Sequence, residues 1–235
     1  LRGLVVSLKN SFKSLSQPDF RTDDEGKEYA VIRAGSGVKL SFLAKYAARF
    51  GLTGIEHLVG IPGSLGGALI MNAGAEGTEI GQVVQRVSRV NADGDLETLD
   101  AAELQFHYRK TVFPRGEGIL VEAELKLYKG DPQAIHRKMD DHLVRRSAKQ
   151  PLTIPNSGSI FKNPPGDTAG RLIEAAGLKG HRVGQAAVSR KHANFIVNHG
   201  EATAQDVRAL IRHIQRTVKE QTGTELETEI IWVGE

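Results

Sequence analysis

One segment of this 235-residue chain has a composition suited to holding an anionic ligand. It runs from Gly60 to Ala75 and contains glycine at positions 60, 63, 66, 67 and 74. Glycine lets a backbone approach a ligand closely and point successive N–H groups at an anion such as a pyrophosphate. The segment is neither a Walker loop nor a GxGxxG dinucleotide-binding turn. Two interpretations stay open, a ligand-binding loop and a tight turn packed under a helix.

A second segment, Gly158 to Pro164, contains Ser159, Lys162 and Asn163. A serine hydroxyl can donate a proton where its surroundings stabilise the alkoxide that remains, and a nearby lysine would do so. The alternative is an ordinary Asn-Pro surface turn. No Gly-x-Ser-x-Gly motif is present, and no Ser-His-Asp triad can be chosen by spacing.

Two isolated charged residues are further candidates. Arg109 follows Tyr108 at a point where we expect a short helix to pass into a loop, and it is either a solvated cation or a functional one. Glu229 lies in an apolar stretch, Glu227 to Val233, that predicts a strand. Its carboxyl group faces either the solvent or a cleft.

Composition excludes several classes of site. The chain has no cysteine, which rules out a disulfide scaffold, a thiolate zinc site and a catalytic thiol. The spacing of His181, His192 and His199 does not match a helical zinc pair, and we expect no metal site. No apolar run approaches the roughly 18 residues of a membrane-spanning helix. We therefore expect no membrane partner and a cytoplasmic location.

The net charge of +3 and the pI near 9.1 are a mild basic excess. The basic clusters, Arg145-Arg146 and Arg190 to His192, are short and lack interleaved aromatic residues. A small anionic ligand accounts for them better than a nucleic acid, and a basic RNA-binding module is kept only as an alternative.

Hydrophobic periodicity and turn residues predict alternating strands and helices. We expect strands at 3–8, 29–34, 83–91, 96–99, 118–127, 185–189, 194–198 and 227–233, and helices at 40–50, after 100, from 131, up to 177 and at 203–223. In the strand at 118–127, the alternation places Ile119, Val121 and Ala123 on one face. The pattern predicts two α+β lobes joined near residues 129–150.

Taken together, six segments resemble the UDP-N-acetylenolpyruvoylglucosamine reductases (UDP-N-acetylmuramate dehydrogenases), flavoenzymes of bacterial cell-wall precursor synthesis. They occur in the family's order at compatible spacing. The segments are GIPGSLGGALIMNAGA (60–75), FHYRKTVF (106–113), RRSAKQP (145–151), NSGSIFKNP (156–164), AGRLIEAAGLKGHRVGQAAVSRKHANFIVN (169–198) and LETEIIWVG (226–234).

The resemblance implies an α+β fold. It would consist of a partial FAD-binding region of the vanillyl-alcohol-oxidase (PCMH) type and a separate α+β substrate-binding domain. The implied boundaries are 1–128 for the FAD-binding region, 129–225 for the substrate-binding domain, and 226–235 for a C-terminal strand that returns to the active site. The short connection between the lobes is similar to the shorter of the family's two variants.

The implied reaction uses two cofactors, FAD and NADPH. Hydride passes from NADPH through FAD to C3 of the enolpyruvyl group of a UDP-sugar, and C2 is then protonated. By resemblance, Arg109 and Glu229 stabilise the negative charge that develops, and Ser159 donates the proton. Glu229 must be protonated to donate a hydrogen bond, so we expect a raised pKa in a partly desolvated site.

The resemblance also implies which residues contact the ligands. Those matching the family's flavin contacts are Ile61, Gly63, Ser64, Gly67, Ala68, Ile70, Gly74 and Ile119 or its neighbour Leu120. Those matching its substrate contacts are Tyr108, Lys162, Asn163, Lys179 and His192. Glu76 stands where many relatives have an aromatic residue, which argues against stacking there.

Family members carry a further segment, with a loop for the FAD pyrophosphate, before the counterpart of Leu1. We therefore expect this chain to be part of a longer reductase and to bind FAD weakly or not at all by itself. The alternative is a degenerate relative that binds a sugar nucleotide without flavin turnover. The sequence leaves the oligomeric state and the preference for NADPH over NADH open.

Overall fold

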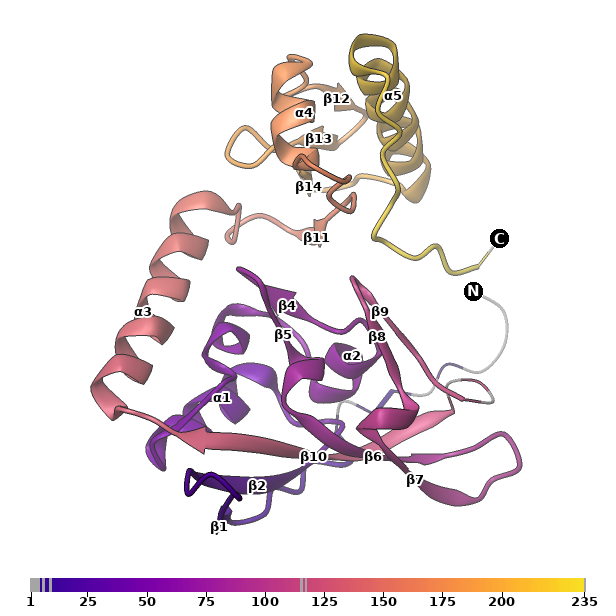
Figure 1. Ribbon diagram of the computed structural model, residues 1–235. Coiled ribbons are helices and arrows are strands. Elements are labelled where there is room, and N and C mark those ends of the chain that lie inside the picture. The colour runs from indigo at the N-terminus through magenta and orange to yellow at the C-terminus, as the bar shows by residue number, and fades with distance from the viewer. Residues whose placement is uncertain (1–4, 6, 9, 115, 117, 235) are drawn as a thin grey trace. The chain divides into compact units, whose positions relative to one another are not determined.

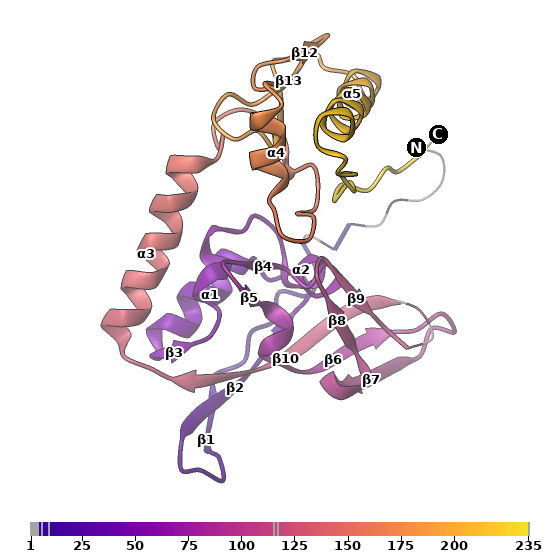
Figure 2. The ribbon, with the colours of Figure 1, turned by 45° about the horizontal axis from the view of Figure 1, so that its top comes forward.

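The computed structural model describes the chain apart from residues 1–4, 6, 9, 115, 117 and 235. The described residues form two compact units, which divide between Val144 and Arg145 (Figures 1 and 2). Each has its own hydrophobic core. In the part of the chain that the structure describes, no helix has the length and apolar character needed to cross a membrane.

The first unit is built on an antiparallel sheet in the order β1-β2-β10-β6-β7, with β3 paired to β10. The strands are β1 (Asp19–Thr22), β2 (Glu28–Gly35), β3 (Leu52–Thr53), β6 (Val84–Val90), β7 (Leu96–Asp100) and β10 (Ile119–Lys129). In the central strand β10, apolar residues alternate with polar ones from Ala123 on, as expected for a sheet with one buried face, whereas β2 is buried at three successive positions, Ala30 to Ile32.

Helices and short 3-10 turns cover the buried face of this sheet (Figure 1). They are α1 (Leu40–Arg49), η1 (Glu56–Gly60), α2 (Leu65–Ile70), η2 (Ile80–Gln82) and η3 (Ala101–Glu103). The apolar positions predicted for α1, among them Leu40, Leu43 and Ala47, are buried. Asp100 and Glu103 form a capping box, and the helix expected after residue 100 is a single 3-10 turn.

Two small hairpins complete the first unit. Strands β4 (Gly74–Ala75) and β5 (Thr78–Glu79) form one, and β8 (Gln105–His107) and β9 (Lys110–Val112) form the other. The helix expected before Arg109 is therefore wrong: Tyr108 and Arg109 are the two-residue turn between β8 and β9. The residues at 105–112 alternate in burial and pair across a tight turn, which a helix period does not describe.

The second unit packs two helices against a four-stranded antiparallel sheet in the order β11-β14-β13-β12 (Figure 1). The strands are β11 (Asn156–Ser159), β12 (Arg182–Val183), β13 (Ala186–Val188) and β14 (Phe195–Asn198), and the helices are α4 (Ala169–Ala175) and α5 (Ala204–Thr222). Thr203 and Asp206 form a capping box at the start of α5. Leu210, Ile214 and Val218 of α5 are buried in the core.

Helix α3 (Pro132–Lys149) follows β10 directly. The sequence placed a domain boundary at 128/129, whereas the contacts divide the chain after Val144. The reason is that Ile135 and Met139 of α3 are buried in the first core. The first part of the helix therefore folds with the sheet of the first unit.

Three local expectations differ from the structure. The stretch 227–233 is not a strand; it makes one isolated antiparallel bridge, between Thr228 and Phe161. At the start of β10 a bulge between Leu120 and Glu122 shifts the alternation, so Leu120 is buried while Ile119 is 51% exposed. Half of the predicted strand at 3–8 lies outside the described residues, and its described residues, Val5, Ser7 and Leu8, are in no strand.

Candidate functional site

Ser159 and Glu229 lie on neighbouring segments of the second unit although 70 residues separate them in sequence. Ser159 ends β11 and pairs with Phe195 of β14. Beyond Ser159, the Glu229 N–H donates to the carbonyl oxygen of Ile160 at 2.8 Å. Both candidate side chains are half-buried. The tertiary structure thus places on adjacent backbone segments two residues that the sequence analysis selected separately.

A buried asparagine holds this segment in place. The Asn194 Oδ1 accepts from the Phe161 N–H at 2.9 Å, and its Nδ2 donates to the Phe161 carbonyl at 2.8 Å. The backbone carbonyl of Asn194 also accepts from the Ile160 N–H at 2.9 Å. Asn194 is 4% exposed. The sequence analysis missed this residue; its signal is a single amide side chain in an otherwise apolar stretch.

Lys162 and Asn163, two predicted substrate contacts, are held by different partners. The Lys162 Nζ lies 2.5 Å from Glu227 Oε1, and the Lys162 N–H donates to the Glu227 carbonyl at 2.9 Å. The Asn163 Oδ1 accepts from the N–H of Ala169, the first residue of α4, at 3.1 Å. The C-terminal segment therefore contacts the loop at two successive polar positions, Glu227 and Glu229.

His192 and Lys179 belong to a cationic cluster that also includes Lys149, at the end of α3. Burial lowers the pKa of His192 first, and the positive charges of Lys179 and Lys149 lower it further. The imidazole is therefore neutral near pH 7, and its Nδ1 accepts from the Asn194 N–H at 3.2 Å. Lys179 also pairs with Glu174 at 2.7 Å. Lys149 was not selected from the sequence, although its segment, RRSAKQP, was.

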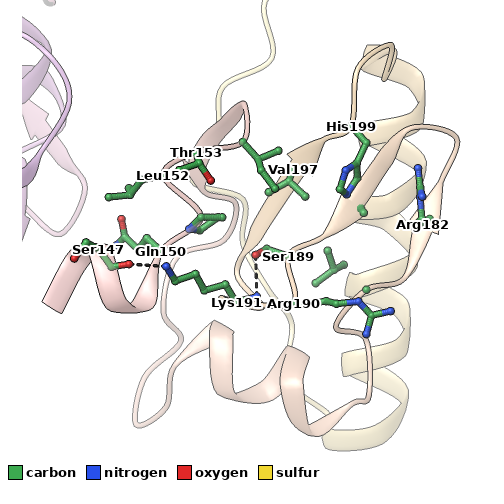
Figure 3. Close-up of a pocket in the computed structure, with 15 residues that line it drawn as sticks. Ser147, Gln150, Leu152, Thr153, Arg182, Ser189, Arg190, Lys191, Val197 and His199 are labelled. Carbon is green, nitrogen blue, oxygen red and sulfur yellow. Dashed lines mark hydrogen bonds between the residues drawn. The ribbon is translucent and has the colours of Figure 1, made fainter. Parts of the chain in front are cut away.

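A cavity of about 620 Å³ opens beside this cluster (Figure 3). Its lining includes Gln150, Gly180 and Lys191, the sequence neighbours of the three clustered residues. Apolar side chains from β13 and β14 contribute Ala187, Val188 and Val197, and basic ones contribute Arg182, Arg190, Lys191 and His199. The Gln150 Oε1 is buried with no hydrogen-bond partner among the described residues. An apolar lining with a basic rim suits a planar group attached to an anion.

Arg109 lies in the first unit, at the tip of the β8–β9 hairpin. Its φ is +57°, a left-handed conformation that favours glycine or asparagine. The guanidinium carbon lies 4.7 Å from the centre of the Tyr108 ring. A cation over an aromatic face at this distance is a favourable contact. Tyr108 is 45% exposed at the tip, and Arg109 is half-buried.

The glycine-rich segment forms the entry to α2. Ser64 is the N-cap residue, but its side chain makes no capping hydrogen bond. Gly63 has a φ of +151°, and a Cβ built on Gly63 or Gly67 would meet nothing within 4 Å. The Oγ of Ser36, which lies beside Gly66, is buried without a partner among the described residues. Open space over glycine backbone next to an unpaired hydroxyl fits the edge of a bound FAD.

The other predicted flavin contacts are spread around this entry. Ile61 and Ile70 are half-buried against the core, Ala68 is buried, and Ile119 is exposed at the start of β10. Gly74 pairs with Glu79, and a Cβ there would lie 2.4 Å from the Thr78 carbonyl oxygen. Helix α2 contacts both β2 and β10, which places the glycine-rich segment at the sheet. Ser36 was missed, and nothing in its sequence context marks it.

The chain was compared with known proteins. A family described as an FAD binding domain matches residues 2–100, and one described as the C-terminal domain of UDP-N-acetylenolpyruvoylglucosamine reductase matches residues 150–233. UDP-N-acetylenolpyruvoylglucosamine reductase 2 of Symbiobacterium thermophilum is 46% identical over 99% of this chain and 72% of its own length. The reductase of Syntrophomonas wolfei is 42% identical over 100% of this chain and 75% of its own length.

A crystal structure of the reductase from Thermus caldophilus superposes with a TM-score of 0.76 at 42% identity. The match covers 85% of this chain and 71% of that one. Fold and site define an α+β FAD-binding protein with a distinct C-terminal domain, which confirms the predicted fold class and the predicted FAD. The chain belongs to the UDP-N-acetylenolpyruvoylglucosamine reductase family, as the six segments indicated.

Proposed function

We propose that this protein reduces UDP-N-acetylenolpyruvoylglucosamine to UDP-N-acetylmuramate with NADPH, a step of peptidoglycan precursor synthesis. Membership of the reductase family supports the proposal. The structural observation that carries it is the adjacency of Ser159 and Glu229, joined through the hydrogen bond from Glu229 to Ile160. A proton donor and an acid on adjacent segments are what protonation beside a developing carboxylate charge requires.

Four side chains share the chemistry. Ser159 gives its proton to C2 of the enolpyruvyl group, and Lys162, three residues further on, is a positive charge that stabilises the alkoxide. Arg109 supplies a permanent cation for the aci-carboxylate that develops. Glu229, in its protonated form, donates a hydrogen bond to the same charge. Tyr108 presents its hydroxyl beside Arg109 as a substrate contact.

FAD supplies the hydride relay between NADPH and C3 of the substrate. In this chain, the backbone at Gly63 and Gly67, the hydroxyl groups of Ser64 and Ser36, and the side chain at Ile119 would hold it. The unpaired Ser36 Oγ and the open space over both glycines support this assignment. Residues up to 128 would then serve the flavin and residues 129–225 the substrate, with 226–235 completing the active site.

The nucleotide end of the substrate occupies the cavity and the cationic cluster beside it. Lys149, Lys179 and neutral His192 receive the diphosphate, while the uracil ring enters the cavity over Val188 and Val197. The Gln150 amide can pair with uracil because uracil offers both an N–H and a carbonyl. The cavity's basic rim and the unpaired Gln150 Oε1 support this placement.

The charge distribution agrees with this division of labour. Residues 145–235 carry 13 Lys and Arg against nine Asp and Glu, whereas residues 1–144 carry 18 against 19. The basic excess is therefore confined to the part assigned to the anionic UDP-sugar. We place the reaction in the cytoplasm, where NADPH and nucleotide sugars are available.

The test is NADPH oxidation that depends on UDP-N-acetylenolpyruvoylglucosamine, measured by absorbance with the FAD-loaded protein, prepared from the full-length gene. Ser159→Ala should lower the rate at least 100-fold, a typical contribution of a positioned proton donor. Ser157→Ala is the matched control, since Ser157 is exposed on the same strand. The proposal is wrong if the unmodified protein shows no substrate-dependent oxidation, or if Ser159→Ala stays within a few-fold of it.

A further inference from the structure

The orientation of the β8–β9 hairpin, which carries Arg109, depends on contacts with the rest of the first unit. Strands β8 and β9 form a separate two-stranded sheet and, among the described residues, pair with no other strand. A hairpin of two three-residue strands is at best marginally stable by itself. The direction in which Arg109 points is therefore set by side-chain contacts between the hairpin and the rest of the first unit.

The turn itself is strained at Arg109. A residue with a Cβ in the left-handed region costs about 1 kcal/mol, and such a conformation persists only where the surroundings hold it. Arg109, with its φ of +57°, needs such support. The neighbours of the turn must therefore be anchored on both sides.

Two buried polar side chains provide these anchors. Asn72 Nδ2 donates to the carbonyl of His107, the residue before the turn, at 3.1 Å. Thr111 Oγ1, on the strand after the turn, donates to the carbonyl of Leu69 at 2.5 Å. Asn72 is 0% exposed and Thr111 is 2% exposed. Both bonds attach the hairpin to residues 69–72, the end of α2 and the residues that follow it.

The orientation of the Asn72 amide is fixed by its other partners. Its Oδ1 accepts from the Gly81 N–H at 3.1 Å, and its Nδ2 donates to Glu79 Oε2 at 2.6 Å. The amide nitrogen must therefore face the His107 carbonyl. Gly81 also allows a close approach, since a Cβ there would lie 2.6 Å from the Phe106 ring of β8. Asn72, with a φ of +42°, is held in a left-handed conformation as well.

We propose that Asn72 is a positioning residue that fixes the position of Arg109 relative to the flavin-facing segment of α2. The inference rests on the proposed function, because it assigns Asn72 a role through the charge-stabilising role of Arg109. Asn72 touches neither the substrate nor the cofactor in this role. It joins the segment that would hold the flavin to the hairpin that carries the cation, so its buried amide, together with the Thr111 hydroxyl, fixes the distance between the two.

The variant Asn72→Gly tests the side-chain amide alone. Glycine accepts the same φ, so the backbone conformation is kept while the amide is lost. In the FAD-loaded protein we expect this variant to slow reduction of the enolpyruvyl substrate 10- to 100-fold, the effect of a displacement near 1 Å. The reduction of FAD by NADPH should stay within threefold. Thr111→Val should act in the same direction, while Thr111→Ser, which keeps the hydroxyl, should retain the rate. Asn91→Gly is the control, since Asn91 accepts two backbone N–H bonds at the β6–β7 turn.

A double variant distinguishes positioning from general damage. If Asn72 acts through Arg109, Asn72→Gly combined with Arg109→Ala should be no slower than Arg109→Ala alone. A second readout needs no flavin: amide hydrogen exchange at Lys110 to Val112 should accelerate at least tenfold in Asn72→Gly and remain unchanged in Asn91→Gly.

Two kinds of failure are distinguishable. The role proposed for Arg109 in the reaction is wrong if Arg109→Ala alone leaves the rate of substrate reduction unchanged. The positioning role is wrong if Arg109→Ala is slow while Asn72→Gly retains the normal rate, or if the two effects multiply. Unchanged exchange at Lys110 to Val112 in Asn72→Gly would also overturn it.

Discussion

The side chain of Asn194 and the backbone of Phe161 are joined by two hydrogen bonds, of 2.9 and 2.8 Å, in the core of the second unit. The amide pairs with the peptide group as a neighbouring strand would. Because Phe161 follows the Ser159 segment and bridges to Thr228, this pair supports both halves of the Ser159–Glu229 arrangement.

Asn194→Ala should lower the free energy of unfolding of the second unit by about 2–4 kcal/mol, because it leaves a buried N–H and a buried carbonyl unpaired. Urea unfolding followed by circular dichroism checks this. Gln185→Ala, at an exposed position, is the control and should change stability by less than 0.5 kcal/mol. Equal stability of the two variants would show that the Asn194 amide contributes nothing.

Glu229→Gln and Glu229→Ala separate two requirements at one position. Glutamine keeps an N–H donor near the developing charge, whereas alanine does not. We expect the rate of Glu229→Ala to fall about 100-fold and that of Glu229→Gln to fall less. In the unmodified protein, ionisation of the Glu229 carboxyl group should slow the reaction at high pH. The glutamine variant should not show this decrease, since an amide does not ionise. A glutamine variant as slow as the alanine variant at every pH would contradict donation by Glu229.

Lys149→Gln should raise the pKa of His192, because the Lys149 charge is one of the causes that lower it. NMR titration of the His192 ring measures the shift. The variant should also raise the KM for the UDP-sugar about tenfold, the effect of losing about 1.4 kcal/mol of binding energy. Lys219→Gln is the control, since Lys219 lies on α5 and pairs with Glu225. An unchanged His192 pKa in Lys149→Gln would show that the Lys149 charge does not act on His192.

His57 makes the stability of the first unit depend on pH. Burial, with the charge of His142 in second place, lowers the pKa of His57 to about 4, while Glu56 opposes the shift. The unfolded chain, with a histidine pKa near 6.5, therefore binds more protons than the folded chain between these values. The free energy of unfolding falls as the pH drops from about 6.5 to 4, by about 3 kcal/mol from this group.

The variant His57→Leu isolates that contribution, since the other titrating groups remain. Urea unfolding at pH 7.5 and pH 4.5 should show a smaller loss of stability in His57→Leu than in the unmodified protein. The leucine also removes an unpaired imidazole, because His57 Nε2 is buried without a partner among the described residues. Identical pH dependence of the two proteins would rule out His57 as the cause.

The sequence was sufficient for features that depend on neighbouring residues. The helices at 40–50 and 203–223 and the strands at 83–91 and 96–99 were predicted from local pattern and found in the structure. The six family segments were sufficient to identify the reductase family. Such features are set by helix and strand periods and by capping chemistry, which act over a few residues.

The predictions from sequence that were wrong concern features that are set by contacts between residues far apart in the chain. The alternation in β10 shifted at a bulge, and the C-terminal stretch makes one bridge in place of a strand. Arg109 lies on a hairpin held by buried bonds to α2, which no pattern around residue 109 reveals. A tertiary contact between segments 35 residues apart outweighs the weak local preference of a short stretch.

The sequence by itself determined which residue types are available for the chemistry: one serine, one arginine, one glutamate and a glycine-rich segment in a family order. Only the tertiary structure decided which of them meet. The segments that carry Ser159 and Glu229 are adjacent because the Ile160 carbonyl accepts from the Glu229 N–H, and Lys149 joins Lys179 and His192 because α3 ends beside them. Side chains far apart in sequence meet only through burial and hydrogen bonding of the whole fold, which local spacing does not encode.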